Sequence, residues 1–238
     1  MNFREKLYHK ACAINIQLTE QQLIQFETFY HQLLEKNKVM NLTAITEEDQ
    51  VISKHFIDSL TCSRIIDLHK TDRMIDVGTG AGFPGIPIKI AFPDINIVLI
   101  DSLNKRINFI HEVIDSLKLR GIDAIHGRAE DLAREKKYRE SFDVCVSRAV
   151  ASLRVLSEYC IPFIKPDGYF VSYKSEKGLQ EIEEAVQCMH VLGSEIDCTD
   201  QFVLPDSDSD RLLIRIKKNK KTPGKYPRRA GIPARYPL

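Results

Sequence analysis

The sequence predicts an α/β protein with a doubly wound, mostly parallel sheet of seven strands and an N-terminal helical extension. From residue 72 onward, short runs rich in β-branched residues start about 20 to 27 residues apart, which leaves room for one crossover helix between neighbours. A glycine-rich turn, Gly78-Thr-Gly80-Ala-Gly82, follows the first run, at the point where such sheets bind their ligands.

The first 67 residues have the pattern of helices rather than strands. Thr19 opens a capping sequence, and apolar residues then recur at helical spacing, so an amphipathic helix is predicted between residues 19 and 37. A second helix is expected to start at Thr46, with Asp49 three residues on, and to bury one apolar side as far as Leu60.

The sheet strands are predicted at residues 74–77, 96–101, 123–127, 142–147 and 168–174. Residues 104–119 form one crossover helix, with Gly121 as its C-terminal stop. A helix over 176–191 leads to two further strands, around 195–204 and 211–218. These two are joined too closely for a crossover helix, so they are expected to form an antiparallel hairpin at the sheet edge.

Length and composition limit the class of protein. With 238 residues and 43% hydrophobic content, the chain can bury one ordinary core, so we expect one main domain at 68–217, an N-terminal helical extension at 1–67 and a basic tail at 218–238. No segment approaches the roughly 20 apolar residues of a membrane span, and the charged N-terminus is unlike a secretory peptide. We therefore expect a cytoplasmic monomer without membrane association. The six cysteines form no CxxC pair, so no metal site is expected.

Charge is divided unevenly along the chain. Ten Lys or Arg and no Asp or Glu lie between Arg211 and Leu238, whereas residues 1–210 hold 24 basic and 33 acidic residues. The tail also contains four prolines and two glycines, so no regular helix or strand is expected there. It is interpreted either as a solvated tail or as a basic arm that contacts the phosphates of a nucleic acid, and the completeness of the split favours the second.

The glycine turn lacks the dinucleotide fingerprint. Phe83 stands where G-x-G-x-x-G requires its third glycine, and no P-loop lysine follows. Asp101 ends the second strand, where a carboxylate can bind a ribose, and the polar turn at 127–131 follows the third. Together these features predict a site for an adenosine without a required phosphate, such as S-adenosylmethionine. The alternative is a glycine turn needed only for tight packing.

The chain resembles the ribosomal RNA small subunit methyltransferase G family, also called glucose-inhibited division protein B, in a series of segments in family order. The segments are NLTAI (41–45), KHFIDS (54–59), IDVGTGAGFPGIPIKI (75–90), DSLNKR (101–106), RAE (128–130), SRAVASL (147–153) and KYPRRAGIP in the tail. They span nearly the whole chain.

The resemblance implies a class I fold and transfer of a methyl group from S-adenosylmethionine to N7 of one guanosine in 16S ribosomal RNA, near the decoding region. Carried over by position, Gly78 and Phe83 would line the cofactor site, Asp101 would bind the ribose, and Ala129 and Glu130 would flank the adenine. Arg148 would close the pocket. Gly80 is expected to leave room for the cofactor, because a side chain there would intrude on it.

The reaction that the resemblance implies needs no general base. Guanine N7 carries a free lone pair and the sulfonium is already activated, so alignment matters more than a base, and no catalytic residue is assigned. Arg148 needs a partner, which is the cofactor carboxylate, an RNA phosphate or an internal acid. His55 and Asp58 lie one helical turn apart, and they either touch the cleft or only tie the N-terminal helices to the sheet.

Three other functions stay open at this stage. The same fold serves methyltransferases that act on small molecules or proteins. A nicotinamide oxidoreductase is disfavoured by Phe83. A non-enzymatic RNA-binding assembly factor would explain the basic tail but not the glycine turn.

Overall fold

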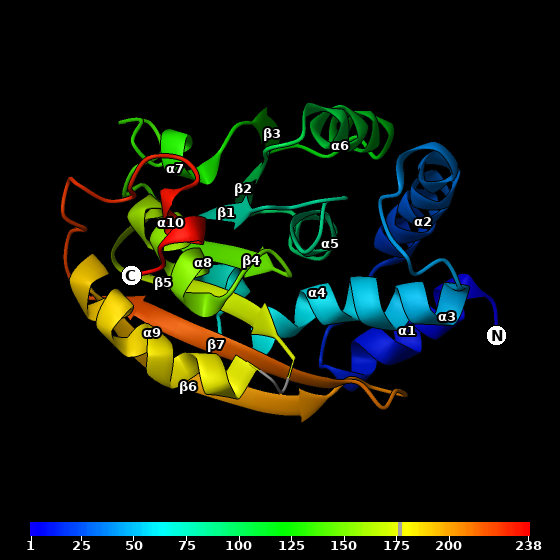
Figure 1. Cartoon of the computed structure of the whole chain (residues 1–238). Helices are drawn as coiled ribbons and strands as arrows, with labels where there is room; N and C mark the ends of the chain where they lie inside the picture. Colours follow the sequence, from blue (N-terminus) through cyan, green and yellow to red (C-terminus); the bar gives the residue numbers. More distant parts are fainter. Residues whose placement is uncertain (176–177) are drawn as a thin grey trace.

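A seven-stranded sheet forms the centre of the protein, which is described here by a computed structural model covering residues 1–175 and 178–238 (Figure 1). The strands are β1 (Arg73–Val77), β2 (Asn96–Asp101), β3 (Ile122–His126), β4 (Phe142–Arg148), β5 (Ile164–Lys174), β6 (Ser194–Val203) and β7 (Asp210–Lys218). Their order is β3-β2-β1-β4-β5-β7-β6, and β1 to β5 run parallel while β7 is antiparallel to both of its neighbours. The predicted doubly wound sheet with an antiparallel edge hairpin is confirmed.

Helices cover both faces of the sheet. One face packs against α1 (Phe3–Ala13), α2 (Glu20–Met40), α5 (Gly85–Ala91) and α6 (Asn104–Ser116), and the other against α8 (Leu153–Cys160) and α9 (Leu179–Leu192). The short helical segments are α3 (Glu48–Val51), η1 (Ile52–Ile57), α4 (Asp58–Leu60), η2 (Thr61–Arg64), η3 (Leu68–Lys70), α7 (Ala129–Leu132), η4 (Ile161–Phe163) and α10 (Ile232–Arg235). Over the described ranges, none of the helices has the length and apolar character that crossing a membrane requires.

The N-terminal extension shares its apolar core with one face of the sheet. Thr19 caps α2 in a complete capping box with Gln22, as the sequence predicts. The buried ring of Phe56 packs against Phe26 at 5.1 Å and against Phe83 of the glycine turn at 6.0 Å, measured between ring centroids. The helices that precede the sheet therefore fix the position of the turn that follows its first strand.

Several predicted boundaries are wrong, each for a local reason. The second N-terminal helix begins at Glu48, because the side chain of Glu47, rather than that of Thr46, accepts the first free backbone N–H groups. This helix also widens into the π-helical segment η1. Helix α6 ends at Ser116, and Lys118 is the first residue after it with a left-handed conformation, three residues before Gly121, which also has a positive φ. The predicted helix start at residues 176–177 lies outside the described residues.

The basic tail packs against the body and contains one helical turn, which corrects the expectation that no regular helix or strand forms there. Lys218 is fully buried and pairs with Glu140 at 2.8 Å, and Arg228 pairs with the buried Glu158 at 2.6 Å. A single helical turn, α10, follows Gly231, which supplies the required positive φ. Two cations of the tail that the sequence offered for RNA binding are thus paired with carboxylates of the body.

Candidate functional site

A cavity of about 750 Å³ opens at the carboxyl ends of the parallel strands. Its walls come from the glycine turn after β1, the ends of β2, β4 and β5, the first residues of β7, and the segment η1–α4 of the N-terminal extension. Five predicted site residues line it together: Gly78, Gly80, Phe83, Asp101 and Arg148. The structure therefore gathers at one edge of the sheet residues that lie up to 70 positions apart in the sequence.

The glycine turn presents bare backbone to the cavity. Gly78 and Gly80 have φ values of +75° and +63°, a conformation that residues with a side chain rarely adopt. A Cβ atom at Gly80 would meet no other atom within 4 Å, so this glycine faces open space. A Cβ atom at Gly78 would lie 2.5 Å from Cγ2 of Val150, which shows that the loop after β4 lies directly over this glycine.

Asp101 is held rigidly at the end of β2. Its side chain is buried, and Oδ2 accepts hydrogen bonds from the backbone N–H of Gly80 at 3.0 Å and from Arg106 at 3.3 Å. Oδ1 accepts from the N–H of Leu103 at 2.9 Å. The carboxylate thus joins the glycine turn to the following helix and leaves its remaining lone pairs beside the cavity.

A second buried carboxylate, that of Asp76 in β1, stabilises the glycine turn through hydrogen bonds. Oδ2 of Asp76 accepts from the Thr79 hydroxyl at 2.6 Å and from the Gly85 N–H at 2.9 Å. Oδ1 has no hydrogen-bond partner among the described residues, and burial raises the pKa of Asp76 to about 7. Sequence reasoning missed this residue, although an acid inside an otherwise apolar strand is a usable signal.

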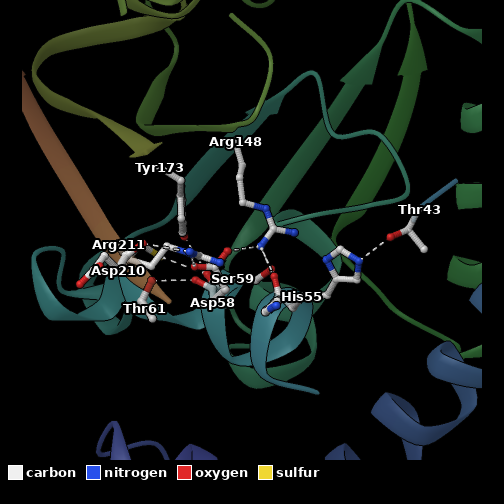
Figure 2. Close-up of polar contacts among 11 residues, drawn as sticks. Thr43, His55, Asp58, Ser59, Thr61, Arg148, Tyr173, Asp210 and Arg211 are labelled. Carbon is white, nitrogen blue, oxygen red and sulfur yellow. Dashed lines mark hydrogen bonds and ion pairs between the residues drawn. The ribbon is translucent and has the colours of Figure 1, made fainter. Parts of the chain in front are cut away.

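Arg148 is paired with an internal acid, one of the three partners that the sequence left open. Its Nη1 lies 2.7 Å from Oδ2 of Asp58, whose Oδ1 lies 2.8 Å from Nε of Arg211 (Figure 2). The side chain of Asp58 is 4% exposed, against 12% for Arg148 and 22% for Arg211. One carboxylate therefore neutralises only one of two guanidinium charges, and this wall of the cavity keeps an excess positive charge.

The guanidinium of Arg148 retains donors for a ligand. Besides Asp58, Nη1 reaches the backbone oxygens of Lys54 and His55 at 3.4 Å, whereas Nε and Nη2 have no hydrogen-bond partner in the described part of the chain. The guanidinium carbon lies 5.2 Å from the ring centroid of Phe83. The ion pair with Asp58 thus fixes a cation over an aromatic ring at the cavity wall.

His55 contacts the cavity through its ring rather than its charge. The imidazole stacks on Phe83, with 4.6 Å between ring centroids and an interplanar angle of 18°. Its Nε2 lies 2.7 Å from the Thr43 hydroxyl (Figure 2). Burial and the nearby Arg148 lower the pKa of His55 to about 3, so the ring is neutral at physiological pH. His55 and Asp58 line the cavity, and Asp58 also ties the extension to β4 and β7, so a tie to the sheet is not their only contact.

Two predicted site residues lie outside the lining of this cavity. Ala129 is the first residue of α7, at the turn after β3, and is half-buried. Glu130 is buried, and its Oε1 accepts from the backbone N–H of Gly231 at 2.9 Å, so its carboxylate points toward the tail. The turn itself stays next to the site, because the N–H of Gly127 donates to the backbone oxygen of Asp101 at 3.0 Å.

Arg211 is the cavity residue that sequence reasoning could not find. It lies at the start of β7, and only the insertion of β7 between β5 and β6 brings it to the carboxyl edge beside Asp58. In the sequence it is one of ten cations in the basic C-terminal region, and nothing local distinguishes it from the others.

Comparison with known proteins identifies close relatives along the whole chain. The family model described as rRNA small subunit methyltransferase G matches residues 22–207. A relative from Lachnoclostridium phytofermentans, named ribosomal RNA small subunit methyltransferase G, is 52% identical over 226 residues, or 95% of this chain and 93% of that protein. A relative of the same name from Alkaliphilus oremlandii is 48% identical over 238 residues, the full length of both.

Solved structures share the fold at low sequence identity. M. jannaschii TYW2 in complex with AdoMet matches with a TM-score of 0.50 and 14% identity over 63% of this chain and 72% of its own. A putative O-methyltransferase from Klebsiella pneumoniae matches with a TM-score of 0.55 and 13% identity over 81% of this chain and 90% of its own. The sheet and its helices thus have the class I methyltransferase fold that the sequence resemblance implied.

Proposed function

The chain belongs to the rRNA small subunit methyltransferase G family, and on that premise we propose that it methylates N7 of one guanosine in 16S ribosomal RNA near the decoding region. The protein is an S-adenosylmethionine-dependent methyltransferase. The observation that carries the proposal is the cavity in which the glycine turn and Asp101 meet the arginine pair of Arg148 and Arg211.

The residues of the cavity fit S-adenosylmethionine. The space beside Gly80 is open, so a ligand can approach the backbone closely there, and the fixed carboxylate of Asp101 suits the two hydroxyls of a ribose. The free donors of Arg148 suit a carboxylate, and Gly78 and Phe83 complete the lining. When bound, the cofactor supplies a methyl group already activated by its sulfonium.

Ala129 and Glu130 are assigned to the cofactor site through their backbone. Gly127, which precedes them in the turn after β3, donates its N–H to the backbone oxygen of Asp101, and the Glu130 carboxylate holds the start of α7 against the tail. In this arrangement Glu130 positions the turn that borders the adenine and makes no contact with it through its carboxylate.

The protein contributes alignment rather than proton transfer. Guanine N7 needs no deprotonation, because its lone pair lies outside the aromatic system. His55 lines the cavity, and with its pKa lowered to about 3 it stays uncharged. We propose that the target base binds next to His55 and Lys54, which line the cavity and are not assigned to the cofactor.

The remaining proposals concern the partner, the oligomeric state and the location of the protein. We propose the small ribosomal subunit, or its 16S RNA, as the partner, a monomeric protein, and the cytoplasm as the place of action. Labelled cofactor and undermethylated small-subunit particles test the function directly, with label expected in 16S RNA at one guanosine. No transfer to that RNA overturns the proposal.

The atom that is methylated can be tested with a substituted RNA. A 16S transcript in which 7-deazaguanosine replaces guanosine lacks the N7 acceptor, so it is expected to accept no methyl group while the guanosine transcript does. Equal transfer to both transcripts would rule out N7. Arg148→Ala should lose activity while keeping the fold, and normal turnover in this variant would contradict the role assigned to Arg148.

A further inference from the structure

Two segments far apart in the sequence meet beside the cofactor edge of the sheet. Residues 128–139 contain α7 and the turns that follow it, and residues 222–238 form the end of the chain (Figure 1). We call the surface that they build together the α7–tail surface. From the sequence, only the tail was predicted to bind a polyanion, whereas in the structure the tail packs against residues 128–139.

Hydrogen bonds to backbone atoms fasten the tail to this partner segment. Nη1 of Arg139 donates to the backbone oxygen of Tyr226 at 2.8 Å, and its Nη2 donates to that of Thr222 at 2.9 Å. Arg134 donates to the backbone oxygen of Pro227, and Glu130 accepts from the N–H of Gly231. Because these contacts use the main chain of the tail, they leave its exposed side chains free to point outward.

The free side chains on this surface are mostly cations. Six exposed ones are Arg128, Lys136, Lys137, Lys225, Arg229 and Arg235. None of the six forms an ion pair with a residue that the structure describes. Few acids offset these cations. Glu130 and Glu158 are buried and already bonded to the tail, and the exposed acids within 128–139 are Asp131 and Glu135.

The α7–tail surface adjoins the candidate site. Arg128 immediately follows Gly127, whose N–H is bonded to the backbone oxygen of Asp101, a residue of the cavity. At the other end of the surface, the terminal Leu238 accepts a hydrogen bond from Arg154 at the start of α8, the helix after β4. The surface therefore begins next to the cavity, at the carboxyl ends of β2 and β3.

We propose that the α7–tail surface binds the sugar-phosphate backbone of the substrate RNA beside the target nucleotide, an inference that rests on the proposed function. Lys and Arg side chains gain affinity for nucleic acid by releasing the counterions of the phosphates. Tyr236 is 57% exposed, with the guanidinium of Arg235 5.3 Å from its ring centroid, and offers an unpaired base a stacking surface. The remainder of the protein is acidic overall, so this surface also orients the approach of the RNA.

The test reverses charges on the surface and leaves its anchors intact. The variant K136E/R229E changes one exposed cation of each segment, and K118E/R120E is the matched control, because these two exposed cations lie at the amino end of β3. Binding to a fragment of 16S RNA is measured over a range of salt concentrations. Affinity for S-adenosylmethionine is measured by calorimetry, and methyl transfer to small-subunit particles is measured in parallel.

K136E/R229E is expected to weaken RNA binding about tenfold or more at low salt. It is also expected to flatten the dependence of log K on log salt by about 0.7 for each lost phosphate contact. Cofactor affinity should stay at the wild-type value in both variants. The neutral K136Q/R229Q variant should show a smaller loss of the same kind, which separates charge from misfolding.

Two results overturn this assignment. RNA affinity and salt dependence equal to those of K118E/R120E would remove the surface from the RNA interface, even if the wild type methylates the particles. Weakened cofactor binding in K136Q/R229Q would show that the surface acts only through the fold. Absence of methyl transfer by the wild type is a different outcome, because it counts against the proposed function itself.

Discussion

Replacing Asp58 by Asn tests whether the cavity wall depends on a single buried carboxylate. Asp58 lies between Arg148 and Arg211, with N–O distances of 2.7 and 2.8 Å. Asn has the same size, so packing is preserved, but the substitution removes the negative charge that both guanidinium groups share. The amide also presents an N–H donor to one of the two cations, which can accept no hydrogen bond.

The expected cost follows from burial. Removing one partner of a fully buried ion pair costs about 3–5 kcal/mol, because the other charge is left uncompensated. The side chains of Arg148 and Arg211 are 12% and 22% exposed and line an open cavity, so water compensates part of the loss. We therefore expect Asp58→Asn to lower the free energy of unfolding by about 2–3 kcal/mol.

The assay is urea unfolding at pH 7, with Asp200→Asn as the matched control. Asp200 pairs with Arg64 at 2.6 Å, but there the side chains are 23% and 39% exposed, so the control is expected to lose only about 0–1 kcal/mol. Cofactor affinity should fall in the Asp58 variant alone, because Asp58 and its two arginine partners line the cavity, whereas Asp200 and Arg64 are not among its lining residues. Losses for the two variants that agree within about 0.5 kcal/mol would refute the reasoning, since burial would then have made no difference.

Three further substitutions test other parts of the structure. Gly85→Ala places a Cβ atom 2.1 Å from Cδ2 of Leu99 and should cost about 1–3 kcal/mol in urea unfolding, with a wild-type value contradicting the tight packing. With the pKa of His55 lowered to about 3, the unfolded chain takes up a proton that the folded chain does not as pH falls from about 6.5 toward 3. Stability therefore declines with acidification, and His55→Gln should decline less between pH 7 and pH 5; parallel curves would exclude His55 as a cause. Arg228→Ala leaves Glu158 buried without its cation and should lower the free energy of unfolding by about 2–4 kcal/mol. The control Arg229→Ala, at the exposed neighbouring residue, should be nearly neutral. Equal melting temperatures for the two variants would refute the anchoring contact.

The parts of the fold set by local pattern were predictable. The strand runs, the capping box at Thr19 and the edge hairpin follow from alternation, hydrogen-bond donors and loop length, and the structure has all three. The end of α6 was missed because Lys118 takes a left-handed conformation, and a lysine gives no sequence signal for that conformation. The π-helical segment η1 was missed because its sequence differs in no visible way from an α-helix.

The candidate site was predictable only along the first strands. Gly78, Gly80 and Asp101 stand at strand ends, where topology alone brings them together. The partner of Arg148 was not predictable, because Asp58 and Arg211 enter through tertiary packing from opposite ends of the chain. The tail was misjudged for a related reason, since composition records its charges but not the carboxylates and arginines of the body that bind it.

The separation of 153 residues between Asp58 and Arg211 has a consequence for synthesis on the ribosome. The N-terminal helices, the glycine turn and Asp101 all emerge early, but the wall of the cavity is complete only when β7 has been made and inserted between β5 and β6. The contacts of Glu130 and Glu158 wait longer still, for Gly231 and Arg228. A chain terminated before its last strand therefore carries every glycine of the turn but lacks the contact between Arg211 and Asp58 that completes the cavity wall.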